Sequence, residues 1–469
     1  MSTPRIGGLA SGMDTESIIK VMLESKQAEV DRIQAKVDED SEKYTSWSEL
    51  NTKLSDLRTV TGSLSSYTTW SQKTVASSDT QYVTATATST SVASYDIFVE
   101  TLAKAHRIAS DAQASTTSAL SLTGDFEVGG ETISIESADT LEGIRDKINS
   151  ASSNMDEDEK VKAYLIGKQL VIERAKTGDT DISITDGASG VLKSLGVLNP
   201  DESLKNEVQQ SEDLSATVNG LAYTGSSNTG ITDAVSGVTF NFLKEMTAGS
   251  TETVTISNDT ATVKSLLTDF ISKYNDSMAY INTQSTVRLS SNNSSITAVG
   301  ILQGDTLLSS MYIKFRSIAS SIETNPNYMN QSFNSLYKIG IGFDTEANQL
   351  SILDESKLDD ALENNFDDVT ELIRGWGETV DGQKKGAGII RQMDEYIYSL
   401  TDPVSGSLTL RQQSIDDLIS YNDSRITSMT QDMFDYEAEL WEHFASMETM
   451  VSEMNSQMNY LMSALGQAG

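Results

Sequence analysis

Residues 19–54 read IKVMLESKQAEVDRIQAKVDEDSEKYTSWSELNTKL, and the spacing of their apolar side chains decides the fold that we expect. These side chains recur in steps of four, three or seven at Ile19, Leu23, Val30, Ile33, Val37, Tyr44, Trp47 and Leu54. Lys26, Asp40 and Asn51 take the remaining positions of the same stripe. Such a heptad pattern is typical of a helix that packs along one seam, where polar residues cost stability but fix the register. Asp14 precedes the stripe and is a suitable N-cap.

The C-terminal end of the chain carries the same pattern. Its first part has the positions Ile415, Ile419, Asn422, Ile426, Met429, Met433, Tyr436 and Leu440. Its second part has Phe444, Met447, Val451, Met454, Met458, Leu461 and Leu465. The step between the two parts is four where three is due, which predicts a local change in supercoiling. A helix with one apolar stripe needs a partner, so we expect the two terminal helices to pair antiparallel and to serve in assembly.

Between these helices the sequence favours β-structure. Alternating apolar residues predict strands at 74–88, 95–102, 164–166, 170–172, 182–184, 216–219, 238–242 and 253–256, and a hairpin of 339–343 with 349–353. Capping residues and apolar faces predict helices that begin near Thr140, Asp259, Asp305 and Asp354.

We therefore expect an α+β multidomain protein, with an antiparallel coiled-coil or helical leg made by the two ends and nested β-rich domains inserted between them. The predicted divisions are terminal helices at 1–45 and 425–469, partly disordered in the monomer, and a helical leg domain at 46–73 and 259–424. An inner β-rich domain covers 74–105 and 214–258, and an outer α+β domain covers 106–213.

The bulk composition excludes several classes of function. The 469 residues carry a net charge of -34, which repels nucleic-acid phosphates and anionic lipid, so we expect neither partner. There are no cysteines, which excludes disulfides and thiolate chemistry. The N-terminus MSTPRIGGLASGMD has no apolar core of the kind found in a cleavable secretory signal. No segment approaches the roughly 20 apolar residues of a membrane helix.

Candidate catalytic residues are few. The two histidines, His106 and His443, are far apart, and no spacing supplies the further groups that a metal or a nucleophile requires. The pairs Asp359-Asp360 and Asp367-Asp368 resemble a carboxylate dyad, but adjacent carboxylates are expected by chance among 68 acidic residues. We predict no catalytic, cofactor-binding or metal-binding residues and no cofactor, so the chain is not expected to be an enzyme.

Local motifs resemble the flagellar filament-capping family, also called the hook-associated protein 2 family. The stretch GGLASGMDTESIIKVML at 7–23 is similar to the family's N-terminal signature, and FASMETMVSEMNSQMNYLMSAL at 444–465 to its closing helix. TISIESADTLEGIRDKIN at 132–149 resembles the Ile-Asn motif of flagellins and hook-associated proteins, within the expected outer domain. The motifs at 237–240, 259–275 and 350–362 complete a resemblance that runs in order along the whole chain.

The resemblance implies a secreted structural protein at the distal tip of the bacterial flagellar filament. It implies a homo-oligomer, usually a pentamer, that assists the folding and insertion of exported flagellin subunits and prevents their loss. The expected partners are flagellin, hook–filament junction proteins and an export chaperone at the C-terminal helix. Export would follow the flagellar type III route, without a cleavable signal peptide.

Two other functions remain open at this point. A hook–filament junction protein or a flagellin belongs to the same system, but the signature at 7–23 and the stretch 454–461 disfavour both. A secreted adhesin or an acidic carbohydrate-active enzyme would use the β-rich modules for binding, and an enzyme would need a convergent site that the sequence does not offer.

Overall fold

The computed structural model describes residues 11–88, 90–289, 296–322, 331–375, 379–380, 383–384 and 386–466. The chain divides into two compact units. We call Met1–Thr69 with Ala261–Gly469 the helical unit, and Trp70–Thr260 the β-rich unit. Each unit is described by itself.

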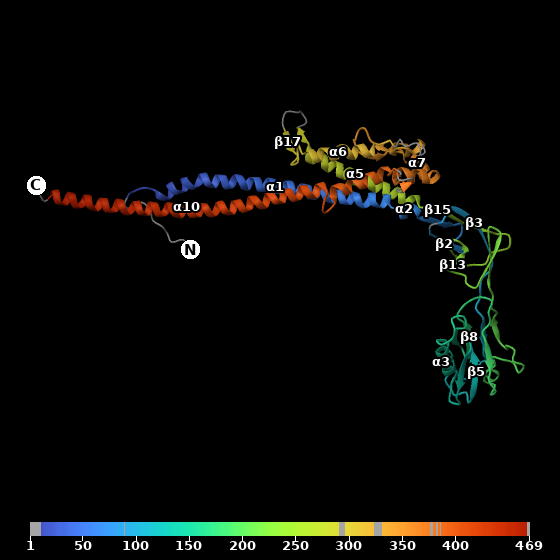
Figure 1. Ribbon diagram of the computed structural model, residues 1–469. Coiled ribbons are helices and arrows are strands. Elements are labelled where there is room, and N and C mark those ends of the chain that lie inside the picture. The colour runs from blue at the N-terminus through green and yellow to red at the C-terminus, as the bar shows by residue number, and fades with distance from the viewer. Residues whose placement is uncertain are drawn as a thin grey trace. The chain divides into compact units, whose positions relative to one another are not determined.

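Two long helices, α1 (Thr15–Ser65) and α10 (Ser407–Gly466), lie side by side in the helical unit (Figure 1). Their direction follows from side-chain contacts between them. Arg425 Nη2 donates to Glu29 Oε1 at 3.3 Å, and the Lys26 ammonium lies 4.5 Å from the ring centre of Tyr436. Residue numbers rise along one helix as they fall along the other, so the predicted antiparallel pairing of the two ends is confirmed.

Shorter elements complete the helical unit. Asp305 and Asp354 cap two of its helices as predicted, by accepting hydrogen bonds from the backbone N–H groups of Leu307 and Lys357. The described helices are α5 (Thr260–Ser285), α6 (Thr306–Ala319), α7 (Glu355–Asn364), α8 (Phe366–Ile373) and α9 (Ile389–Thr401), with the 3-10 turns η1 (Gln331–Phe333) and η2 (Leu336–Ile339). The described antiparallel pairs are β16 (Val287–Leu289) with β17 (Ile296–Val299), β18 (Ile341–Phe343) with β19 (Leu350–Ile352), and β20 (Thr379–Val380) with β21 (Gln383–Lys384). The short helix α2 (Tyr67–Ser71) leads out of this unit.

The β-rich unit contains two hydrophobic cores. The first lies between a five-stranded and a three-stranded antiparallel sheet, and Val83, Ile97, Phe240 and Val254 are among its fully buried residues. The five-stranded sheet has the order β1 (Lys73–Ser77), β15 (Glu252–Asn258), β3 (Ala93–Thr101), β11 (Leu214–Val218) and β12 (Leu221–Gly225). The three-stranded sheet has the order β13 (Ile231–Val235), β14 (Val238–Phe242) and β2 (Val83–Ala87).

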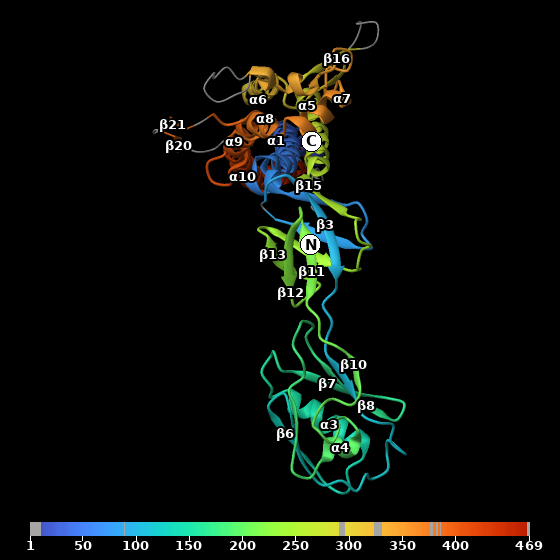
Figure 2. The ribbon, with the colours of Figure 1, turned by 90° about the vertical axis from the view of Figure 1, so that its right-hand side faces the viewer.

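The second core joins two further sheets and two helices (Figure 2). Thr140 caps α3 (Leu141–Ser152) as predicted, and the apolar face of that helix contributes Leu141, Ile144 and Ile148 to the core. The other helix is α4 (Val191–Leu195). The sheets have the orders β10 (Glu207–Gln209), β4 (Arg107–Ala109), β8 (Gln169–Arg174), β7 (Val161–Ile166) and β6 (Glu131–Ile135), β5 (Gly124–Val128), β9 (Ile184–Asp186).

One predicted strand was wrong. Residues 74–88 were expected to alternate as a single strand, but they form β1 and β2, which belong to different sheets. Asp79 causes the break, because its side chain accepts from the Gln81 N–H at 2.8 Å and closes a turn between the two strands. The fold class is confirmed as an α+β multidomain protein with β-sheet modules between two paired terminal helices. The finer boundaries at 45, 105, 213 and 425 stay predictions.

Candidate assembly surface

The predicted seam of α1 is largely buried. Ile19, Val30, Ile33, Val37, Trp47 and Leu54 are buried, whereas Leu23 is half-buried and Tyr44 is exposed. Beyond Tyr44 the buried stripe runs through Trp47, Leu50, Leu54 and Leu57. At about 100° per residue, Tyr44 lies at the edge of this stripe, and its side chain is therefore exposed. Sequence reasoning did not include Leu50 and Leu57, although their steps of three and four continue the heptad pattern.

The second half of α1 has more than one neighbouring helix. Tyr280 of α5 donates its hydroxyl to the Ser46 carbonyl at 3.1 Å, and Thr61 donates to Asp394 of α9 at 2.9 Å. A helix that is contacted from several sides buries a wider stripe than a two-helix seam does. This explains why Thr61, a polar residue, is fully buried.

The seam of α10 changes along its length. Leu440 is buried, and the residues before and after it are half-buried, namely Ile426, Met429, Met433, Tyr436, Phe444, Met447 and Val451. The last predicted positions are exposed: Met454 65%, Met458 61%, Leu461 58% and Leu465 69%. The seam positions of α10 are therefore covered in its first part and uncovered at its end.

The uncovered end has a simple cause. The backbone N–H of Ser11 donates to Glu448 Oε2 at 3.3 Å, and α1 begins at Thr15, so the described part of the partner helix stops beside this turn of α10. Residues 7–10 of the N-terminal signature lie outside the described residues. Near the same end, α1 exposes Ile18, Val21 and Met22. Apolar side chains thus gather on both helices where their pairing ends, which is characteristic of a surface for further chains.

Lys26 and Asp40 have charged or aromatic neighbours on the seam, whereas the side-chain oxygen of Asn51 is buried without a hydrogen-bond partner among the described residues. Lys26 lies over the ring of Tyr436, as described above. Asp40 is buried and lies within 3.8 Å of Lys36 and 3.7 Å of Lys43. The pKa of Lys43 is raised, mainly by its hydrogen bond to Glu39. These contacts suit the expected role of polar seam residues in fixing the register of the pair.

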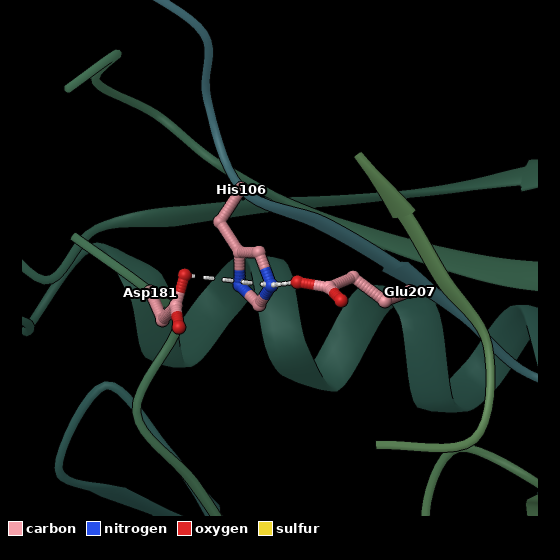
Figure 3. Close-up of side chains that lie close together, drawn as sticks. All are labelled: His106, Asp181 and Glu207. Carbon is pink, nitrogen blue, oxygen red and sulfur yellow. Dashed lines mark hydrogen bonds and ion pairs between the residues drawn. The ribbon is translucent and has the colours of Figure 1, made fainter. Parts of the chain in front are cut away.

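The β-rich unit brings two carboxylates to His106, which the sequence spacing did not reveal (Figure 3). His106 is fully buried, and its Nδ1 accepts a hydrogen bond from the Ile182 N–H at 2.9 Å. A neutral imidazole carries its single hydrogen on the other nitrogen in that case. That nitrogen, Nε2, lies 3.2 Å from Glu207 Oε1 and 3.7 Å from Asp181 Oδ1. The hydrogen on Nε2 takes the electron pair that a metal ion would bind. The cluster therefore has the geometry of a structural hydrogen bond between His106 and Glu207.

The acidic pairs are not convergent sites either. Asp359 lies 2.6 Å from the ammonium of Lys264, and Asp360 accepts from Asn364 at 2.9 Å. Asp367 and Asp368 lie in the first turn of α8, where negative charge is favoured by the helix dipole. The second histidine, His443, is exposed on α10 beside Glu439.

Within the part of the chain that the structure describes, no helix is both long and apolar enough to cross a membrane.

Comparison with known proteins gives consistent results. Residues 211–456 match the C-terminal region of flagellar hook-associated protein 2, and residues 11–106 match its N-terminal region. The B-type flagellar hook-associated protein 2 of Pseudomonas aeruginosa is 26% identical over 80% of this chain and 78% of its own length. The flagellar hook-associated protein 2 of Aeromonas caviae is 24% identical over 97% of both chains. The crystal structure of the D1, D2 and D3 domains of the flagellar cap protein from Escherichia coli shares the fold, with a TM-score of 0.53 at 24% identity over 79% of this chain and 99% of that chain.

The paired terminal helices, the apolar surface at their shared end and the β-sheet modules between them define a structural assembly protein. The chain belongs to the flagellar hook-associated protein 2 family. It is a cap protein of the bacterial flagellar filament, located outside the cell at the filament tip, and not an enzyme.

Proposed function

We propose that this cap works as a homo-oligomer, a pentamer by its resemblance to the family, that receives exported flagellin, assists its folding and insertion, and prevents its loss. The observation that carries the proposal is the uncovered end of the α10 seam, from Met454 to Leu465. A helical segment with four exposed apolar side chains at heptad spacing is stabilised when another helix or groove covers it.

The assembly residues in this proposal are the seam residues of both terminal helices. Those of α1 and the first part of α10 hold the two ends of one chain together, and those from Met454 onward contact other chains. The same exposed segment is the proposed binding site of an export chaperone before assembly. One surface used by successive partners keeps apolar side chains covered at each stage.

The proposed domain roles follow the predicted boundaries. Residues 1–45 and 425–469 form the end of a leg, and 46–73 with 259–424 form the leg domain. The inner module of 74–105 and 214–258 and the outer module of 106–213 form a plate above the growing filament. Flagellin and the hook–filament junction proteins are the proposed neighbours of the leg end.

A rescue experiment tests the capping role. Purified full-length protein is added to cells that lack this gene but export flagellin, and filaments are counted by electron microscopy while secreted flagellin is measured in the medium. We expect filaments to form and free flagellin to fall. Persistent leakage of flagellin, with folded protein present at the filament tips, would contradict the role.

Matched variants test the surface. The first replaces Met454, Met458, Leu461 and Leu465 with Gln. The control replaces Ser452, Ser456, Asn459 and Ser463 with Ala, on the opposite side of the same turns. We expect the first variant to lose rescue and the control to keep it, with equal helix content by circular dichroism. Equal rescue by both would remove these four seam positions from the assembly surface.

A further inference from the structure

A small cavity lies in the helical unit, away from the α1–α10 seam. It has a volume of about 140 Å³ and is enclosed by α5, α6 and the hairpin of β18 and β19. Its walls include Tyr274, Asn282, Tyr312, Arg316, Phe343 and Asn348. No lining residue is acidic, although the chain has 68 acidic residues. The cavity therefore has a positive group and no negative group in its wall.

Arg316 supplies the positive charge. Its guanidinium lies 4.4 Å from the centre of the Phe343 ring, and Nη1 donates to Asn348 Oδ1 at 2.9 Å. Among the described residues, no carboxylate lies within ion-pair distance of Arg316, whereas Arg411 pairs with Asp305 at 2.6 Å in the same unit. A guanidinium has five N–H donors, so Arg316 keeps donors for a ligand after the bond to Asn348.

Tyr274 forms part of the inner wall through its ring. Its side chain is 1% exposed, and its hydroxyl is too deeply buried for a ligand in the cavity to reach it. Burial raises the pKa of Tyr274, so the side chain stays neutral. The wall opposite the solvent is therefore aromatic and uncharged, and Arg316 is the donor that a ligand would meet.

The walls of the cavity are held in place by bonds on its rim. The Asn275 side chain donates to the Leu350 carbonyl at 2.8 Å and accepts from the Leu350 N–H at 2.9 Å. This two-way bond fixes α5 to β19. The Tyr274 ring also packs against Phe343, at 6.3 Å between ring centres. The walls are therefore positioned before any ligand arrives, which lowers the entropic cost of binding.

We propose that this cavity binds a carboxylate group, which pairs with the Arg316 guanidinium and lies against the rings of Phe343 and Tyr312. Aromatic walls and a volume close to that of a cavity of about 150 Å³ known to hold benzene suit a carboxylate on a small flat or aliphatic body. The carboxylate belongs either to a free organic acid or to a Glu or Asp side chain of another polypeptide. This binding does not depend on the capping role.

The test uses the full-length protein and benzoate, with benzamide as the neutral molecule of the same shape. Saturation-transfer NMR at millimolar ligand measures binding of each. We expect benzoate to bind and benzamide to bind weakly or not at all, because only the carboxylate pairs with Arg316. Absence of benzoate binding, or equal binding of both molecules, would overturn the proposal.

Variants place the binding in this cavity. Arg316→Gln removes the charge, and Lys314→Gln removes the same charge from an exposed position on α6. We expect Arg316→Gln to weaken benzoate binding at least about tenfold, as the loss of a charged hydrogen bond does, and Lys314→Gln to leave it unchanged. Benzoate binding that survives Arg316→Gln, or that falls equally in Lys314→Gln, would refute the assignment.

A competition experiment separates the two sources of the carboxylate. N-acetylglutamate N-methylamide carries the side chain of a polypeptide glutamate without free termini. If it displaces benzoate, the cavity accepts an acidic side chain. If benzoate binds and this compound does not compete, the ligand is a free organic acid. Either result supports a carboxylate site, provided that Arg316→Gln abolishes it.

Discussion

At the residue scale, hydrogen bonds determine what individual side chains do in this protein. His106 lies beside two carboxylates, yet the Ile182 N–H takes the electron pair of Nδ1 and so sets the tautomer. Asp402, at the end of α9, accepts hydrogen bonds from both the backbone and the side chain of Ser405. Both residues have roles that follow from their immediate neighbours.

Zinc binding tests the interpretation of His106. His106→Asn keeps an acceptor near the Ile182 N–H and removes the group between Asp181 and Glu207. We expect the heat of zinc binding, measured by calorimetric titration, to be the same for the parent and the variant. We also expect removal of metal with EDTA to leave the unfolding midpoint unchanged. A stoichiometric zinc site present only in the parent would contradict the tautomer.

Acid stability tests the role of Asp402. Its carboxylate accepts backbone N–H bonds from Ser405 at 2.8 Å and Val404 at 3.1 Å, and these bonds, together with the Tyr398 hydroxyl, lower its pKa to about 2. The folded pKa lies below the unfolded value of 3.8, so the stabilisation is present above about pH 4 and is lost as the pH falls to about 2.

We therefore expect the stability difference between the parent and Asp402→Asn to be largest near neutral pH and to shrink toward about pH 2. Thermal unfolding of the helical unit at a series of pH values, followed by circular dichroism, measures it. A difference that stays constant over this range would show that Asp402 acts only as a neutral acceptor.

At the scale of the element, the buried stripe on α1 explains which seam residues contribute to the stability of the helical unit. The first half of the helix buries Val30, Ile33, Val37 and Asp40, in alternating steps of three and four, and the second half buries a wider face against neighbours that include α9 and α5. Trp47 and Tyr44 are both aromatic seam positions in the sequence, but only Trp47 lies within the buried face. Stability should therefore depend on position within the stripe and not on aromatic character.

The pair Trp47→Ala and Tyr44→Ala tests this expectation. Trp47 is almost completely buried, so its loss leaves a cavity and should cost about 3–5 kcal/mol of unfolding free energy. Tyr44 is exposed, and its loss should cost about 1 kcal/mol or less. Urea unfolding followed by helix signal measures both. Equal losses of unfolding free energy in the two variants would mean that the position in the heptad repeat, and not burial, sets the contribution of each residue.

The uncovered end of α10 has a different expectation. The side chains from Met454 to Leu465 make few contacts within the chain, so removal of residues 452–469 should leave the unfolding midpoint of the helical unit unchanged. Helix signal should fall by the length removed, and filament rescue should be lost. A large fall in the midpoint would show that this segment stabilises the single chain.

At the scale of the whole molecule, the β-rich unit is an insertion whose two ends meet. β1 pairs with β15, so Lys73 lies opposite Asn258, and the Asp259 N–H donates to the Gln72 carbonyl at 3.2 Å. Both hydrophobic cores lie inside this unit. Adjacent ends and internal cores are the properties of a domain that folds without its host.

We expect residues 70–260 to fold when expressed alone. The expected observations are a cooperative thermal transition, β-type circular dichroism and resistance to limited proteolysis. Thr74→Pro, which removes the backbone donor of a hydrogen-bonded pair between β1 and β15 next to the domain boundary, should lower the midpoint in the isolated unit and in the full chain alike. An unfolded isolated unit would show that the helical unit is needed to close it.

The sequence by itself determined the features that depend on near neighbours. Heptad spacing identified the two terminal helices, and capping residues located the starts of α3, α6 and α7. These signals are local because a helix face repeats within a few residues and a cap acts within one turn. The ordered motifs at both ends also indicated the family.

Tertiary structure alone decided the features that depend on distant residues. It separated β1 from β2 into two sheets, and it brought Asp181 and Glu207 to His106. It left the end of α10 uncovered because α1 begins too late to reach it, and it closed the cavity around Arg316. Sequence periodicity cannot show these features, because each depends on which segments far apart in the chain pack together, and the free energy of that packing comes from the whole arrangement of surfaces.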